Sequence, residues 1–173
     1  MKKSHELVID QTWDGKKIPI SEMTYIRFSE DSQILAITAE GPFHNDPLPM
    51  VAPGPTPKLW EYEVTELFLL GADGSYVEIE IGPAGHYLIL ILSEYRRPKT
   101  TIDPLWIETI TKRDRFKASL HLPMSKMPKR PWRANAYAIH GTGNYRKYLA
   151  CHGINAPDVQ APDFHRLSSF KPV

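Results

Sequence analysis

The chain has too little cysteine, net charge and continuous hydrophobic sequence for several common classes of protein. Its one cysteine, Cys151, cannot form an internal disulfide. Lysine and arginine (21) nearly balance aspartate and glutamate (20), so no field of one sign favours nucleic acid. No apolar run approaches the roughly 20 residues of a membrane helix or the roughly 7–15 of a secretory signal. We therefore expect no nucleic-acid partner, no membrane partner and a cytoplasmic location.

Helical periodicity is also lacking, whereas residues that break helices are frequent. Sixteen prolines and ten glycines divide the 173 residues into short segments, which is typical of strands joined by turns. We predict a single domain, 1–173, folded as an all-β antiparallel sandwich of jelly-roll type with about nine strands. The tail 142–162 is expected to be mostly irregular. The expected strands are 7–9, 25–28, 34–38, 61–70, 76–81, 87–92, 106–111, 116–122 and 132–140.

The longest interruption of this pattern is the proline-rich segment 41–58, which contains six prolines. Each proline removes an amide donor and restrains the residue before it, so neither a helix nor a strand ladder can run through. Loops longer than about 12–15 residues are often functional. Two interpretations stay open, a rigid cover for a sheet edge and a loop that faces a ligand.

The hairpin of 61–70 and 76–81 has two possible registers, and the register decides where Glu66 points. A four-residue loop would put Glu66 on the apolar face, where an unpaired carboxylate is costly. A three-residue loop puts Gly74 where a type I turn with a G1 bulge needs a positive φ. We choose this second register, which pairs Glu66 with Glu80, because a one-residue slip inverts every side chain. Their face also carries Trp60, Tyr62, Val64, Phe68, Tyr76 and Glu78.

Glu66 and Glu80 would repel each other in this register, since opposed side chains have Cβ atoms roughly 4.5–5.5 Å apart. A bound cation, a nearby arginine such as Arg96 or Arg97, or a shared proton would compensate. One interpretation is therefore an ion pair on a partly solvated sheet face. The other is a ligand face, because aromatic rings cover the apolar side of a sugar while carboxylates accept hydrogen bonds from its hydroxyls.

The histidines offer further candidates, although none of the seven has the spacing of a zinc motif. His140 ends a strand in which three alanines share its parity, so it either packs at the sheet rim or borders a site. His44 and Asp46 could meet residues 163–165 around a cation. Metal occupancy is therefore left open.

Two segments of the chain resemble the centre of family-nine carbohydrate-binding modules. They are 59–68 (LWEYEVTELF) and 76–85 (YVEIEIGPAG). The resemblance implies a β-sandwich whose ligand face includes Trp60 and Glu66.

The chain also departs from that pattern. Sugar-binding members supply an arginine and an asparagine where this chain has Glu80 and Gly82, and they clamp the sugar with a second tryptophan late in the chain. No tryptophan follows Trp132 here, and the tail offers Tyr145 and Tyr148. The resemblance thus implies the fold more directly than it implies the ligand.

Over most of its length the chain also resembles the uncharacterised chromosome four open reading frame thirty-three family, for which no activity is established. The matching motifs are 12–15 (TWDG), 42–43 (PF), 59–66 (LWEYEVTE), 85–86 (GH), 138–141 (AIHG) and 162–165 (PDFH).

Together these observations favour non-catalytic recognition of a saccharide or polyol, with Trp60 stacking on the ring and no cofactor. Two alternatives remain. A glycoside-processing enzyme could use Glu66 and Glu80, whose expected separation fits the roughly 5–5.5 Å of retaining hydrolysis. A protein-interaction module or dimer could use the same aromatic face; the oligomeric state and the ligand are left open. The predicted ligand-binding residues are Trp60, Tyr62, Glu66, Glu78, Glu80 and His140, and no catalytic residue is predicted.

Overall fold

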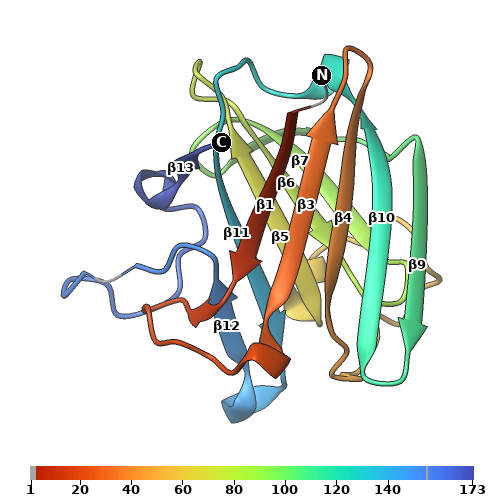
Figure 1. Ribbon diagram of the computed structural model, residues 1–173, viewed down its shortest axis with the longest axis vertical. Helices are drawn as coiled ribbons and strands as arrows, with labels where there is room; N and C mark the ends of the chain where they lie inside the picture. Colours follow the sequence, from red (N-terminus) through yellow and green to blue (C-terminus); the bar gives the residue numbers. More distant parts are fainter. Residues whose placement is uncertain (1–2, 155) are drawn as a thin grey trace.

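Two antiparallel sheets pack face to face in the computed structural model, which describes residues 3–154 and 156–173. The predicted antiparallel β-sandwich is thereby confirmed. Figure 1 looks onto the five-stranded sheet, with the fainter strands of the other sheet behind it. Its spatial order is β1-β3-β4-β10-β9. These strands are β1 (Lys3–Ile9), β3 (Thr24–Glu30), β4 (Ile34–Pro42), β9 (Trp106–Lys112) and β10 (Arg115–Pro123).

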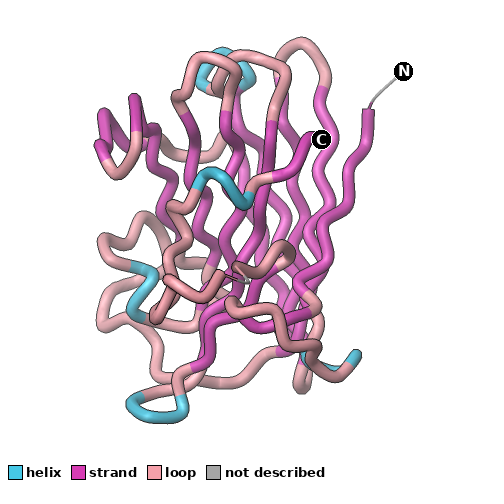
Figure 2. Tube along the Cα trace, turned by 90° about the vertical axis from the view of Figure 1, so that its left-hand side faces the viewer, coloured by secondary structure: helices cyan, strands magenta, loops and turns pink. Residues whose placement is uncertain are grey.

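The second sheet has the order β2-β12-β11-β5-β6-β7-β8, and β13 pairs with β11. Helix is confined, within the described residues, to short 3-10 turns (Figure 2), and none of them is long and apolar enough to cross a membrane. The strands are β2 (Gln11–Thr12), β5 (Val64–Leu70), β6 (Tyr76–Ile81), β7 (Tyr87–Glu94), β8 (Arg97–Thr101), β11 (Arg133–His140), β12 (Lys147–Ala150) and β13 (Lys171–Pro172). The turns are η1 (Ile20–Glu22), η2 (Leu59–Glu61), η3 (Met124–Lys126), η4 (Gly143–Tyr145) and η5 (Leu167–Ser169).

The core lies between the sheets and follows the period of two that a strand imposes on its side chains. In β4 and β10 every second residue is buried. These residues meet the inward-facing side chains of β5, β6 and β11 in one apolar cluster. Its members include Ile37, Ala39, Leu67, Leu69, Val77, Ile79, Leu120 and Ala136.

The outer face of the larger sheet is covered as well, by the C-terminal segment 162–173. Phe170 of this segment belongs to a buried cluster with Phe68 and Tyr137, and the ring of Phe164 stacks on Tyr137 with 3.8 Å between centroids. This cover explains why every residue of β5 is buried. A strand that is buried on both faces does not alternate in polarity as a half-exposed one does.

Several strand predictions need correction. The strand expected over 61–70 begins only at Val64. The strands β8 and β12 were not predicted, because all five residues of β8 are exposed and β12 has only four residues, Lys147–Ala150. Such short or exposed strands carry too few alternating apolar residues to be recognised.

The proline-rich segment 41–58 acts as an edge cover. The N–H of Thr56 donates to the carbonyl of Tyr87 at 2.8 Å, and the N–H of Tyr87 donates to that of Gly54 at 3.0 Å. Glu63 accepts from the backbone N–H of His44 at 2.8 Å. The segment supplies none of the described residues that line the cavity below, so the structure favours the first of its two interpretations.

Candidate functional site

The hairpin between β5 and β6 has the register that the sequence predicts. Glu66 pairs with Glu80, and the loop 72–74 is closed by a backbone hydrogen bond of 2.8 Å between its neighbours on either side. Gly74 has a φ of +81°, a left-handed value that glycine adopts at little cost. Glu66, Glu78 and Glu80 therefore point away from the core, onto the outer face of the larger sheet.

A cavity of about 390 Å³ opens on this outer face. Its volume lies within the roughly 300–1,000 Å³ of sites that bind small molecules. Buried carboxyl groups, an exposed indole and aromatic rings from the tail all border it, so apolar and polar surface converge. The lining residues are Trp60, Glu66, Glu78, Leu90, Leu92, Arg96, Pro98, Ile139, Tyr148, Pro162, Phe164 and His165.

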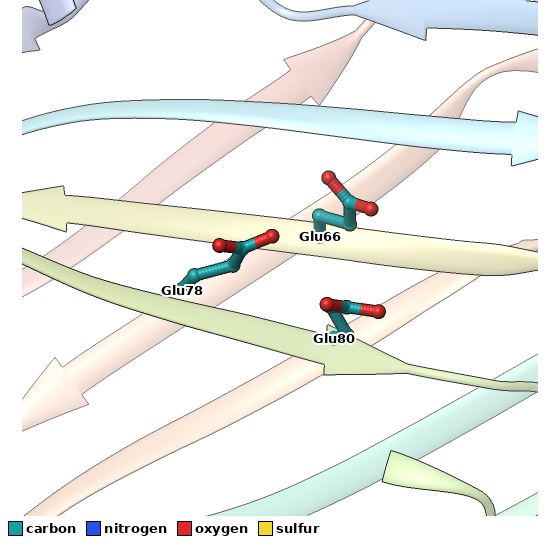
Figure 3. Close-up of side chains that lie close together, drawn as sticks. All are labelled: Glu66, Glu78 and Glu80. Carbon is teal, nitrogen blue, oxygen red and sulfur yellow. The ribbon is translucent and has the colours of Figure 1, made fainter. Parts of the chain in front are cut away.

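Three glutamates form the polar part of the site (Figure 3). Each of the three places one carboxylate oxygen within 4.8 Å of those of the other two, and all three side chains are buried: Glu66, Glu78 and Glu80. Glu80 is 0% exposed. Among the described residues, none makes a hydrogen bond of good geometry with either of its carboxylate oxygens. Glu80 thus lies beneath the cavity, next to the two glutamates that line it.

Burial is the first cause that raises the pKa of all three carboxyl groups, because it disfavours their charged forms. The charge of Glu78 raises the pKa of Glu66 further, and both charges raise that of Glu80. A side-chain hydrogen bond with Glu80 and the charge of Arg96 oppose the increase of the pKa at Glu78. Arg146 opposes it at Glu66, and a backbone hydrogen bond with Trp60 opposes it at Glu80, without cancelling it. The cluster therefore requires either protons or an added positive charge at neutral pH.

The arginines that the sequence offered as counter-charges are engaged elsewhere. Arg96 donates to Asp163 at 2.9 Å, and Arg97 pairs with Glu94 on the exposed edge of the sheet. Among the described residues, no lysine or arginine forms an ion pair with any of the three glutamates. The structure therefore does not support the simple ion-pair interpretation of this face.

Trp60 borders the cavity from a 3-10 turn, not from the predicted strand. Lys58 has a left-handed φ of 58°, and Leu59 is buried, so the chain turns before β5 begins. The guanidinium of Arg146 donates to the carbonyls of Trp60 at 2.5 Å and Tyr62 at 3.2 Å. These contacts hold the turn in place and leave the indole 42% exposed at the cavity.

The tail adds a functional residue that sequence reasoning did not place here. His165 Nε2 lies 3.6 Å from a carboxylate oxygen of Glu78, and its Nδ1 lies 2.7 Å from the hydroxyl of Tyr76. Burial lowers the pKa of His165 to about 4, so its ring is neutral at pH 7. The motif at 162–165 was visible in the sequence, but nothing local showed which face it covers.

Besides Glu80, two other predicted site residues do not line the cavity. Tyr62 is half-buried and packs beside Leu59 and Ile139. His140 follows Ile139, which lines the cavity, so it points to the opposite face of the sheet. There its ring stacks on His44 with 3.5 Å between centroids. The cation site predicted between His44 and the tail is therefore not formed, because His165 lies on the outer face of the sheet.

The two sheets form an antiparallel β-sandwich, a fold that the chain shares with a candidate carbohydrate-binding protein. A candidate carbohydrate-binding protein from Bacteroides uniformis superposes with a TM-score of 0.73 at 15% identity, over 98% of this chain and 84% of that chain. A family-nine carbohydrate-binding module from Caldicellulosiruptor kristjanssonii, in complex with glucose, superposes with a TM-score of 0.43 at 17% identity. That match covers 96% and 78% of the two chains. The first of these likenesses shows the fold.

The chain belongs to the UPF0462 C4orf33 family. It is 36% identical to the rat UPF0462 protein C4orf33 homolog over 171 residues, which cover 95% of this chain and 85% of the relative. The zebrafish homolog is 36% identical and covers 96% of this chain and 87% of its own length. The human UPF0462 protein C4orf33 is 34% identical, with 94% and 84% covered. No protein-family model matches the chain.

Proposed function

We propose that the protein binds a saccharide or a similar polyol, without catalysis, in the cavity on the outer face of its larger sheet. One observation carries this proposal: an exposed indole and two carboxyl groups converge on a cavity of about 390 Å³. Sugars have apolar C–H faces and many hydroxyl donors, which is the combination such a site suits.

In this proposal Trp60 stacks on the ring, and Glu66 and Glu78 accept hydrogen bonds from its hydroxyls. Tyr148 of β12 and Phe164 of the tail also line the cavity and supply further aromatic surface. The guanidinium of Arg96 also lines the cavity and can donate to a ring or hydroxyl oxygen. The fold shared with the candidate carbohydrate-binding protein supports the assignment.

The burial of Glu80 weakens the hydrolase alternative. Retaining hydrolysis needs two carboxyl groups that both reach the glycosidic bond. Of the pair proposed from the sequence, only Glu66 lines the cavity, since Glu80 lies beneath it. The pair Glu66 and Glu80 therefore does not suit retaining hydrolysis, and the carboxyl groups that do reach the cavity are those of Glu66 and Glu78.

Substitution Trp60→Ala should weaken saccharide binding by about tenfold or more, because stacking on an aromatic ring contributes about 1 kcal/mol beyond the area it buries. Isothermal titration against a panel of mono- and oligosaccharides measures this. Trp106→Ala is a matched control, since Trp106 is 44% exposed but lies on β9 of the other sheet. It should leave the affinity unchanged.

Two results would count against the proposal. One is the absence of any heat at millimolar concentrations of every sugar tested. The other is an equal loss of affinity in both tryptophan variants. A change in sedimentation mass on Trp60→Ala would instead favour the interface alternative.

A further inference from the structure

The glutamate cluster has a geometry that suits a cation. Glu66 on β5 and Glu78 and Glu80 on β6 project from the same side of one sheet (Figure 3). One oxygen from each lies within 4.8 Å of the other two. Two ligands of one ion lie no farther apart than twice the metal–ligand distance. For Ca²⁺ this upper limit is roughly 4.6–5.2 Å. The three oxygens are therefore close enough together to share one Ca²⁺.

Arg146 and Arg96 lower the pKa of Glu66 and Glu78, respectively, but among the described residues neither arginine forms an ion pair with the cluster. The Arg146 guanidinium donates to backbone carbonyls, and that of Arg96 donates to Asp163 and Tyr95. The nearest ionisable neighbour with a resolved contact is His165, at 3.6 Å from Glu78. Three buried carboxylates with so few counter-charges are expensive to keep ionised.

Glu80 points independently to a missing partner. Its side chain is 0% exposed. Its carboxyl group lies near the Glu78 side chain and the Trp60 backbone, but neither of its oxygens makes a hydrogen bond of good geometry with a described residue. The great majority of buried polar side-chain atoms in folded proteins do have one. The three side chains lie close together on the same side of β5 and β6 (Figure 3), so a ligand bound among them would satisfy the Glu80 carboxyl group.

We infer that Glu66, Glu78 and Glu80 bind a calcium ion at the base of the cavity. Ca²⁺ binds oxygen ligands, carboxylates among them, and six to eight oxygens from protein and water usually surround it. Three glutamates offer at most six oxygens. Because Glu66 and Glu78 also line the cavity, water or a ligand hydroxyl can complete the shell from that side.

This inference does not depend on saccharide binding, and its test uses Ca²⁺ alone. Protein treated with a chelator is titrated with CaCl₂ by calorimetry at pH 8, and the thermal midpoint is measured with and without Ca²⁺. We expect one ion per chain and a higher midpoint in its presence. Glu80→Gln and Glu66→Gln should each weaken binding by at least about tenfold, because affinity follows the number of charged ligands.

Glu94→Gln is the matched control, since Glu94 is an exposed glutamate at the end of β7 of the same sheet. It should bind Ca²⁺ as the unaltered protein does. Circular dichroism confirms that each variant is folded, and glutamine keeps the size of the side chain it replaces. The inference is overturned if no Ca²⁺ binds at millimolar concentration, if Mg²⁺ binds more tightly than Ca²⁺, or if Glu80→Gln leaves the affinity intact.

Discussion

Substitution Phe170→Ala should lower the free energy of unfolding by about 3–5 kcal/mol, the range found when a buried phenylalanine is truncated. The Phe170 side chain is fully buried on the outer face of the larger sheet. Its ring packs edge-on against Phe68 with 5.8 Å between centroids. Alanine would remove these contacts and leave a cavity that the strands of a sheet cannot close.

Chemical denaturation followed by fluorescence measures this loss. Phe170→Leu keeps most of the apolar volume and should cost less than half as much, because the cavity it leaves is smaller. Tyr145→Ala is a control on an aromatic residue that is exposed and should change stability by no more than about 0.5 kcal/mol. A loss below about 1 kcal/mol for Phe170→Ala would mean that the tail is not part of the cooperative unit.

The same tail also shapes the candidate site. Phe164 and His165 line the cavity, and both lie within 162–173, the segment that Phe170 anchors. The side chain of Arg133 strengthens that anchor with two hydrogen bonds to the carbonyl of Phe170, at 3.0 and 2.7 Å. We therefore expect variants that loosen the tail to weaken ligand binding as well as stability.

The sequence predicts the central hairpin well because two local rules agree there. Apolar residues alternate on both sides of a short turn, and Gly74 occupies the one position of that turn that needs a positive φ. Only one register satisfies both rules, and it places Glu66 opposite Glu80. The most distinctive feature of the site is therefore fixed by fewer than twenty consecutive residues.

The rest of the site depends on contacts between distant parts of the chain, which local patterns do not encode. His140 illustrates this. It shares its parity with the inward-facing alanines 134, 136 and 138, which puts it on the core face of β11. Local patterns do not show which residue of β11 lies opposite Glu66. That residue is Tyr137, 71 positions away in the sequence. The 3-10 turn at Trp60 and the docking of the tail are set in the same non-local way.

Substitution Glu80→Gln should raise the free energy of unfolding by about 1–3 kcal/mol at pH 8 in the absence of divalent cations. Glutamine keeps the shape of the side chain, is neutral without taking up a proton, and can donate to the neighbouring carboxylates. Burial and the charges of Glu66 and Glu78 raise the pKa of Glu80 in the folded protein. Its ordinary value of 4.5 applies in the unfolded chain.

The sign of the pH dependence follows from that direction. Below pH 4.5 the carboxyl group is protonated in both states, so the wild type and the variant should differ little. As the pH rises above 4.5 the unfolded chain releases its proton while the folded protein retains it. The wild type then loses stability relative to Glu80→Gln, and the gap should widen up to the raised pKa. Glu94→Gln, on the exposed sheet edge, should show no such widening.

Denaturation curves at pH 4, 6 and 8, recorded with a chelator and again with Ca²⁺, test both halves of the argument. With the chelator present, a variant less stable than the wild type at pH 8 would show that Glu80 has a partner the carboxylate needs. With Ca²⁺ at about 100 times its dissociation constant, the bound ion should add about 2.7 kcal/mol to the wild type. The stability advantage of the glutamine variant should then shrink by at least about 1.3 kcal/mol, because a site weakened tenfold gains only about 1.4 kcal/mol from the same concentration of Ca²⁺.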